Sequence, residues 1–469
     1  MLTPGQSRLL LSILSIAAFM AGLDLFIVNV AFDDIGRDFQ GESLSNLSWI
    51  LNGYAIIFAA LLVPLGRLAD RYGRKEGFLL GVALFTVASG ACAASNSLWM
   101  LVAFRVLQAV GAAALTPASL GLLLSVFPPE RRSGAVRIWS ASAALAAAAG
   151  PVFGGLLVSA SWRWVFLVNL PIGLATLVVA ARRLPSSRDT APSRMPDLAG
   201  AGVLTLAVGL LALGLVKIDD WSAVLVTVIL AAAVLGFAGF WLRSRRHASP
   251  VIEPALLRVP VFAWSNATAI VFSAAFAANL LCAILWMQNV WDYSALRTGL
   301  GVAPGPLMVP LGAIVASRLA HRVPAGRLAA LGCLLCAVGV TLMWQQLAQK
   351  PDYAGTLLPG WLVGGIGVGL ALPTILSTAT TDLPQERFST GSAVVNMSRQ
   401  IGSVLGISLL VTLLGTPKTY DETQRAFGHA WIAIGVFMLL GAVTAVGMSP
   451  VPRRRNVPSR TPRKTPNSV

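Results

Sequence analysis

Three charged residues lie inside long apolar stretches of the sequence: Asp24, Arg105 and Arg399. An ionisable side chain in hydrocarbon is costly and is usually kept for function. Asp24 lies roughly 11 Å, and Arg105 roughly 12 Å, from the same end of the predicted helix bundle, at 1.5 Å per residue. If the two side chains meet, a change in water access alters the affinity of the Asp24 carboxylate for a proton. We therefore predict a proton-coupling pair; a permanent ion pair that only holds two helices together remains the alternative.

Arg399 occupies the middle of its apolar stretch, roughly 16 Å from the nearer end. Its neighbours include Asn396 and Gln400. No acidic residue other than Asp24 falls within the predicted apolar spans, so the partners of Arg399 must be carbonyl groups, water or a bound anion. The sequence places Arg399 and Asn396 among the candidate substrate contacts without deciding between these partners.

The composition indicates a membrane protein. Of the 469 residues, 56% are hydrophobic and only 12% are charged, which is too apolar for a soluble protein of this length. Fourteen apolar runs reach the length of about 20 residues that a helix needs to cross the hydrocarbon core. The first run contains Asp24 and has no small-residue cleavage site, so it stays in the mature protein. We predict an all-α membrane protein with 14 transmembrane helices.

The predicted topology explains the net charge of +16. Successive loops alternate between the two sides of the membrane. This places most of the 35 Lys and Arg residues on the side that carries the segment Gly66–Gly81, which we call the Gly66 loop, as expected for a cytoplasmic face. Both termini then lie in the cytoplasm, and no nucleic-acid partner is needed to explain the charge. The four Cys residues lie in apolar runs and the three His residues do not cluster, so we expect no metal site.

Internal repetition predicts two related halves. The segment Gly66–Gly81 recurs as Ser317–Gly332, and Gly111–Pro117 recurs as Gly367–Pro373. The repeat covers helices 1 to 6 and 9 to 14, which predicts two pseudo-symmetric six-helix lobes plus two inserted central helices. The expected organisation is an N-terminal lobe (1–185), a linker with two inserted helices (186–255), a C-terminal lobe (256–450) and a basic disordered tail (451–469).

The charged loop resembles the loop between helices 2 and 3 in the major facilitator superfamily of transporters. The match consists of Gly66, Leu68, Ala69, Asp70, Arg71, Gly73, Arg74 and Lys75. The resemblance implies a cytoplasmic gate formed by Gly66, Asp70, Arg71, Gly73 and Arg74. An acid in this loop can pair with Arg131 or Arg132 of the next cytoplasmic loop, or with a helix N-terminus. His321 replaces the acid in the second copy, so the two gates need not be equivalent.

Three further motifs narrow the resemblance to the fourteen-helix drug:proton antiporter branch. Asp24, Asn29 and Ala31 match its helix 1 signature, with Phe26 in place of the usual small hydroxyl residue. Arg105 and Gln108 are similar to its helix 4 pattern. The helix 5 motif that distinguishes antiporters from symporters is similar to Gly150, Pro151, Gly154 and Gly155. Gly and Pro let helices approach and bend, which can seal the lobe interface; ordinary small-residue packing is the alternative.

The resemblance implies a proton-coupled secondary transporter that exports small hydrophobic or cationic compounds by alternating access. It implies no cofactor, the proton gradient as energy source, and a monomer in the bacterial inner membrane. A metabolite exporter or proton symporter of the same fold remains open. An enzyme or sensor is disfavoured, because the sequence has no nucleotide loop, paired membrane carboxylates or nucleophile motif. The candidate substrate-cavity residues are Asn29, Asn52, Tyr54, Gln108, Trp286, Gln288, Asn396 and Arg399.

Overall fold

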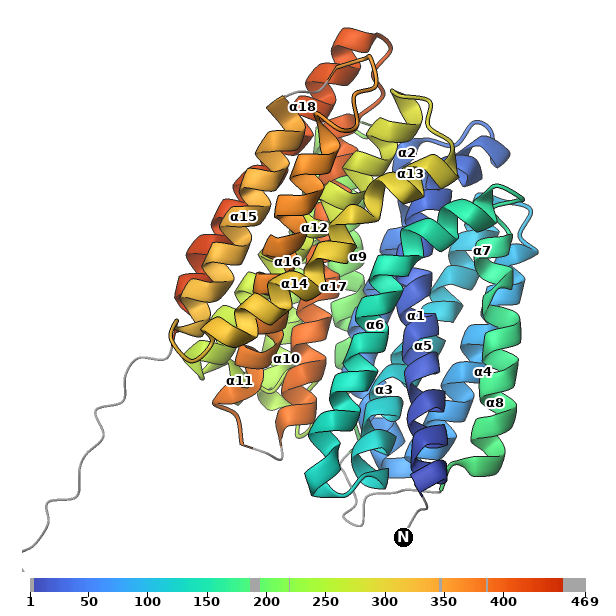
Figure 1. The fold of residues 1–469 in the computed structure, drawn as a ribbon, viewed down its shortest axis with the longest axis vertical. Coiled ribbons are helices and arrows are strands. Elements are labelled where there is room, and N and C mark those ends of the chain that lie inside the picture. Colours follow the sequence, from blue (N-terminus) through green and yellow to red (C-terminus); the bar gives the residue numbers. More distant parts are fainter. Residues whose placement is uncertain (1–3, 186–194, 219, 346–347, 385–386, 450–469) are drawn as a thin grey trace, which may run out of the picture.

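The computed structural model describes residues 4–185, 195–218, 220–345, 348–384 and 387–449. Within these ranges all regular secondary structure is helical (Figure 1). Fourteen helical segments are long and apolar enough to cross a membrane, which confirms the expected number. The assignment of the Gly66 loop to the cytoplasm remains a prediction from charge. We call the end of the bundle that carries this loop the basic end.

The first lobe contains six crossings. The segments α2 and α3 together form one crossing, and α7 and α8 form another. The helices of this lobe are α1 (Pro4–Asp38), α2 (Leu44–Leu47), α3 (Trp49–Tyr72), α4 (Arg74–Ala93), α5 (Leu98–Val126), α6 (Pro129–Val158), α7 (Trp164–Leu167) and α8 (Asn169–Arg183).

The insert contributes two crossings and the second lobe six. Within the second lobe, α13 and α14 together form one crossing, and the short α11 precedes the lobe. These helices are α9 (Leu198–Val216), α10 (Ala223–Arg246), α11 (Pro254–Leu257), α12 (Pro260–Asn289), α13 (Ala295–Val302), α14 (Pro304–Leu319), α15 (Ala325–Gln345), α16 (Leu357–Thr381), α17 (Phe388–Leu414) and α18 (Tyr420–Val446).

The repeated glycines bring equivalent helices into close contact in both lobes. A side-chain carbon added to Gly81 of α4 would lie 2.6 Å from the backbone nitrogen of Leu115 in α5. A carbon added to Gly332 of α15 would lie 2.6 Å from the backbone nitrogen of Ala371 in α16. Only glycine permits this backbone approach. The sequence repeat is therefore a repeat of helix packing.

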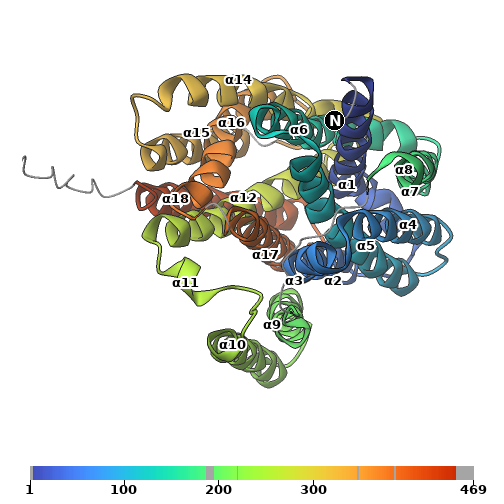
Figure 2. The same cartoon turned by 90° about the horizontal axis from the view of Figure 1, so that it is seen from below.

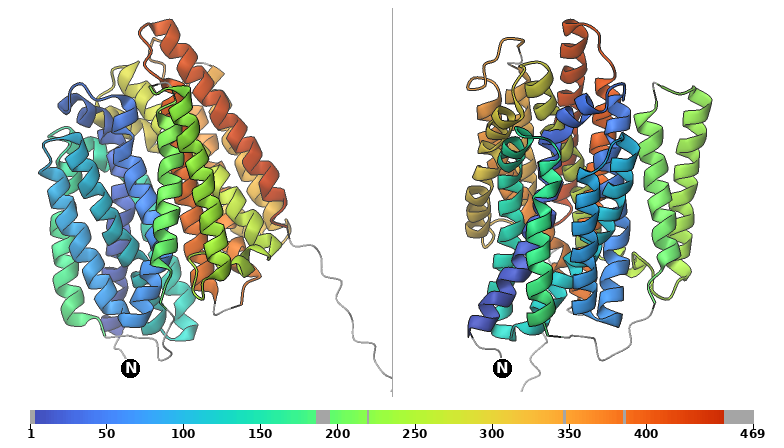
Figure 3. Two further views of the ribbon diagram at one scale, coloured as in Figure 1. Left: turned by 180° about the vertical axis from the view of Figure 1, so that it is seen from behind. Right: turned by 90° about the vertical axis from the view of Figure 1, so that its right-hand side faces the viewer.

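The inserted helices α9 and α10 stand beside the bundle (Figures 2 and 3). The α9 helix contacts α3 of the first lobe and α17 of the second. At the end of α9, the Thr412 hydroxyl of α17 donates to the Leu215 carbonyl at 2.7 Å, and the Ser45 hydroxyl donates to the Val216 carbonyl at 3.2 Å. The insert therefore bridges the two lobes on one side.

Asp197 fixes the start of α9. Its carboxylate accepts a hydrogen bond from the Gly200 amide at 2.8 Å, and the Arg243 guanidinium of α10 donates to it at 2.8 and 2.9 Å. Burial raises the pKa of the Asp197 carboxyl, but the hydrogen bonds from Arg243 and Gly200 outweigh burial and leave this pKa below its usual value. This cap and ion pair hold α9 against α10.

The lobes meet each other at the end opposite the basic end. The Gln288 amide, in the last turn of α12, donates to the Val30 carbonyl of α1 at 3.0 Å. The Asn52 amide, in the first turn of α3, donates to the Ser408 hydroxyl of α17 at 3.1 Å. Because both bonds are buried, they close the lobe interface at this end.

Candidate functional site

Asp24 of α1 and Arg105 of α5 form a buried ion pair. The Arg105 Nη1 atom lies 2.5 Å from the Asp24 Oδ2 atom, and the side chains are 1% and 0% exposed. The α1, α5 and α8 helices pack together, which brings these residues from distant parts of the sequence to one level. The structure thus joins the two charges that the sequence analysis singled out, while their role in proton coupling stays a prediction.

Three uncharged side chains complete the surroundings of Asp24. Gln108 Nε2 donates to Asp24 Oδ1 at 2.9 Å, and Asn169 Nδ2 of α8 donates to the same oxygen at 3.3 Å. Both amides also donate to the Ser89 hydroxyl of α4, at 3.1 and 3.0 Å. We call Asp24, Arg105, Gln108, Asn169 and Ser89 the Asp24 network. All five are buried.

The sequence analysis missed Asn169 and Ser89. Asn169 stands alone between apolar residues in the stretch F-L-V-N-L-P, just as Asp24 does in its own stretch. The rule that a polar group in hydrocarbon needs a partner applies to amides as well as to charges. Extending that rule from charged residues to amides would have identified Asn169.

Aromatic rings flank the Arg105 guanidinium. The Cζ atom of Arg105 lies 4.2 Å from the centroid of the Tyr54 ring and 5.8 Å from that of Phe166. Arg105 Nε donates to the Ile50 carbonyl of α3 at 3.3 Å. Stacking and hydrogen bonding of this kind stabilise a guanidinium away from water. Tyr54, expected among the substrate contacts, is thus a buried support for Arg105 in this conformation.

The Asp24 network can hold an ionised carboxylate, because hydrogen-bond donors from Arg105, Gln108 and Asn169 converge on its two oxygens. A protonated Asp24 would present a hydroxyl group to these donors in place of an acceptor. Proton binding therefore requires some of the donors to move. The arrangement links the charge of Asp24 to the packing of α1 against α5 and α8.

The Gly66 loop is a tight connection between α3 and α4. Gly73 has φ 135°, a backbone conformation that favours glycine, and it separates the two helices. A side-chain carbon on Gly66 would lie 3.1 Å from Pro117 of α5. Arg74 Nε lies 2.7 Å from Asp70 Oδ1, so Asp70 pairs with a residue of its own loop. The expected pairing of Asp70 with Arg131, Arg132 or a helix N-terminus stays a prediction. Arg71, also expected in this gate, stacks on the Tyr72 ring at 5.6 Å.

Arg67, next to this loop, binds the end of the insert. Its Nη1 atom donates to the Pro250 carbonyl at 2.7 Å and to the Ser249 hydroxyl at 2.9 Å, while Nη2 lies 3.1 Å from Glu253 Oε1. The other oxygen of Glu253 lies 3.6 Å from Nε of Arg387, just before α17. Glu253 thus connects the lobes at the basic end. Arg67 lies within the repeated segment Gly66–Gly81, but the sequence analysis did not predict this contact.

The motif in α6 serves two different contacts. Side-chain carbons on Gly150 and Gly154 would meet Phe26 and Ile27 of α1, so these glycines pack within the first lobe. A carbon on Gly155 would lie 2.6 Å from the Leu296 Cα atom of α13 in the second lobe. Facing it, a carbon on Gly299 of α13 would meet the Pro151 backbone. Half of the motif therefore lies at the lobe interface, where the antiporter resemblance expects a seal.

The remaining candidate residues lie in different surroundings. Asn29 is buried and donates to the Leu25 carbonyl of its own helix at 2.9 Å. Trp286 is fully buried in the second lobe, with ring centroids 5.1 Å from Phe427 and 5.8 Å from Trp431 of α18. The structure thus places Trp286, one of the candidate substrate-cavity residues, in an aromatic core in this conformation. Gln288 closes the lobe interface against α1, as does Asn52 against α17.

Comparison with known proteins decides the family. The model of the Major Facilitator Superfamily matches residues 14–407. The chain belongs to the Major Facilitator Superfamily. Because this is a family of transporters, the enzyme alternative is set aside. The superfamily fold agrees with the two packed lobes and the multi-pass helices described above.

Named relatives of this superfamily member are resistance and export proteins. The chain is 33% identical to the tetracenomycin C resistance and export protein of Streptomyces glaucescens, over 86% of this chain and 75% of the relative. It is 32% identical to a methylenomycin A resistance protein of Streptomyces coelicolor, over 93% and 91% of the two chains. It is 34% identical to the cephamycin export protein of Amycolatopsis lactamdurans, over 91% and 89%. These relatives agree with the drug-efflux branch that the motifs indicated.

Solved structures show the same superfamily fold. A bacterial homologue of the human lysosomal transporter Spinster, in an inward-facing and occupied conformation, superposes with a TM-score of 0.68 at 15% identity. The match covers 97% of this chain and all of the other. At this identity the similarity concerns the fold alone.

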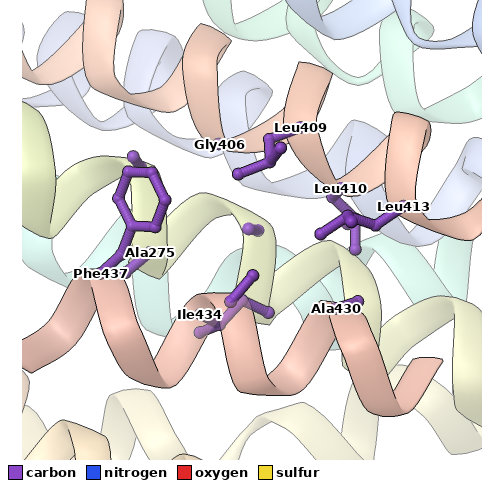
Figure 4. Close-up of a pocket in the computed structure, with 11 residues that line it drawn as sticks. Ala275, Gly406, Leu409, Leu410, Leu413, Ala430, Ile434 and Phe437 are labelled. Atoms are coloured by element: carbon purple, nitrogen blue, oxygen red, sulfur yellow. The ribbon is translucent and has the colours of Figure 1, made fainter. Parts of the chain in front are cut away.

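One apolar gap in this superfamily member is too small for a drug. It lies between α12, α17 and α18, and its volume is ≈ 10 Å³ (Figure 4). The lining is entirely hydrocarbon and includes Ala275, Gly406, Ile434 and Phe437. A gap of this size holds about one water-sized sphere.

Proposed function

We propose that this transporter exports small organic compounds in exchange for protons, and that Asp24 binds the proton. The similarity to resistance and export proteins over most of the chain supports export. The proton gradient is the energy source in this proposal, and no bound cofactor is required. The working unit is a monomer in the bacterial inner membrane, because each element of the proposal lies within one chain.

The closed network around Asp24 is the observation on which proton coupling rests. In this conformation the carboxylate is buried and accepts hydrogen bonds from Arg105, Gln108 and Asn169. When a proton binds, the carboxylate loses its charge and Arg105 loses its ion-pair partner. The donors then face a group that can itself donate, which weakens the packing of α1 against α5 and α8.

Alternating access supplies the link between proton and substrate. The buried bonds of Gln288 to Val30 and of Asn52 to Ser408 must break before the end opposite the Gly66 loop can open. At the basic end, Glu253 must release Arg67 or Arg387 when the lobes separate there. A change in α1 reaches the opposite end directly, because Val30 lies on the same helix as Asp24.

The experiment is energised dye efflux from cells that make the wild-type protein or Asp24→Asn. We expect wild-type efflux to stop with a proton uncoupler, and Asp24→Asn to lose about tenfold or more of the uphill rate, because the amide cannot take up a proton. Asp38→Asn is the matched control, since Asp38 lies on the same helix but is exposed and pairs with Arg163. Uphill efflux by Asp24→Asn at the wild-type rate would refute Asp24 as the coupling group.

A further inference from the structure

Arg399 carries a charge that no acidic residue balances within the described ranges. The ion pairs of these ranges involve other residues. Arg399 Nη1 donates to Asn396 Oδ1 of its own helix at 3.1 Å, and its Nε atom is buried without a hydrogen-bond partner. Asp24, the acidic residue that the sequence analysis placed within the apolar spans, is already bound by Arg105. A guanidinium within a membrane span whose Nε atom is buried and unpaired is costly, so an external partner is expected.

The packing of α17 shows which of its faces are occupied. Ser398 donates to Asn266 of α12, and a side-chain carbon on Gly402 would touch the same helix. Ser408 accepts a bond from α3, and Thr412 donates to α9. Successive residues of a helix are rotated by about 100°, so these contacts fix the directions of α12, α3 and α9 around α17. One arc of the α17 surface remains, which lies between α12 and α3 on the side opposite α9. Because α9 stands outside the bundle, this arc points into it (Figure 2).

Between Ser392 and Ser403, this arc of α17 is polar. All its members named here are partly exposed, in contrast to the buried residues that face α12 and α3. Within the arc, Asn396 Nδ2 donates to the Ser392 carbonyl at 2.9 Å, and Ser403 donates to the Arg399 carbonyl at 3.1 Å. We call this arc the Arg399 stripe; it comprises Ser392, Asn396, Arg399, Gln400 and Ser403.

The chemistry of the Arg399 stripe fits an anion. A guanidinium has five N–H groups in a fixed fork that matches a carboxylate, and the bond from Arg399 to Asn396 uses a single nitrogen. A carboxylate beside Nε would satisfy the orphaned donor and balance the charge in one step. A cationic compound would add a second positive charge to the same surface, which is unfavourable.

We propose that the Arg399 stripe is the anion-recognition element of the export site, and that the exported compounds carry a carboxylate. This inference rests on the proposed function and narrows its substrate class, against the hydrophobic or cationic compounds that the family resemblance implied. Asp24 and Arg399 then have separate tasks. The first lobe binds the proton, and the second binds the acid group of the substrate.

Two dyes with the same xanthene skeleton and opposite charge test the proposal. Fluorescein carries a carboxylate, and rhodamine 123 is a cation without a free carboxylate. Using fluorescence polarisation with purified full-length protein in detergent, we expect fluorescein to bind about tenfold or more tightly than rhodamine 123, as for hydrogen bonds to a charged group. Arg399→Gln should remove this preference, and Arg399→Lys should keep part of it, because the charge remains and the fork is lost.

Arg297→Gln is the matched control, because Arg297 lies in α13 with its Cζ atom 3.7 Å from the centroid of the Tyr293 ring. It should retain wild-type binding of both dyes. The proposal is overturned if fluorescein shows no saturable binding, if rhodamine 123 binds as tightly, or if Arg399→Gln keeps the preference. If Arg399→Gln does not fold, weakened fluorescein binding by Arg399→Lys at a normal unfolding temperature supports the proposal, and unchanged binding overturns it.

The assay separates this inference from the proposed function. Dye binding in detergent requires no proton gradient, so it is measured independently of proton coupling. A protein that binds fluorescein through Arg399 but pumps without a proton requirement would refute proton exchange and keep the anion site. A protein that loses efflux with Asp24→Asn but binds only rhodamine 123 would support proton exchange and refute the anion site.

Discussion

The first lobe surrounds its arginine, Arg105, completely, whereas Arg399 of the second lobe is partly exposed. Arg105 contacts Asp24, Gln108 and the Tyr54 ring within the lobe. Arg399 contacts Asn396 and keeps an orphaned Nε atom. Yet both lobes use the same glycine contacts between equivalent helices. The duplicated architecture thus preserves packing, while polar groups differ between the lobes, which lets each lobe take a different chemical task.

Removal of the two arginines should break the symmetry most clearly. Arg105→Gln leaves the buried Asp24 carboxylate without its charge partner and should lower the free energy of unfolding by about 3–5 kcal/mol. Arg399→Gln removes a partly exposed charge that has no acidic partner among the described residues, so it should leave this free energy unchanged or raise it. Denaturant unfolding of both proteins in the same detergent provides the comparison. An equal loss in the two variants would show that Arg399 is a structural residue.

Substitution of the repeated glycines should instead reveal the shared part of the lobes. Gly81→Ala and Gly332→Ala each place a methyl group 2.6 Å from a backbone nitrogen of the facing helix. We expect each to cost about 1–3 kcal/mol, as overpacking usually does. Thermal unfolding of the two variants measures this, with Gly209→Ala in α9 as the control, because no atom lies within 4 Å of a carbon added there. A large loss in one lobe alone would argue against equivalent packing.

Amide substitutions give the smallest expected effect. Asn169→Ala removes a donor to Asp24 and Ser89, and should cost about 1 kcal/mol, as for hydrogen bonds between membrane helices. Asn396→Ala removes bonds within one helix at a partly exposed position and should cost less. Unfolding temperatures measured side by side test the order. If Asn396→Ala is the more destabilising, the Arg399 stripe is part of the fold and its polar groups are not reserved for a ligand.

The sequence by itself determined the number of crossings and the charged residues to be explained. A run of apolar residues long enough for the bilayer is a local property, so the fourteen spans follow from composition along the chain. The cost of charge in hydrocarbon singled out Asp24, Arg105 and Arg399 before any contact was known. The glycine repeats likewise predicted two related lobes.

Only the tertiary structure decided which side chains meet. Asn169 reaches Asp24 across 145 positions of sequence, and Glu253 reaches Arg67 across 186. Such contacts depend on the rotation of each helix about its axis and on its neighbours, which local composition does not encode. For the same reason the sequence could not show that Trp286, a candidate substrate-cavity residue, packs against α18 and is buried. The apolar runs specify that helices cross the bilayer, and their packing specifies which polar groups face one another.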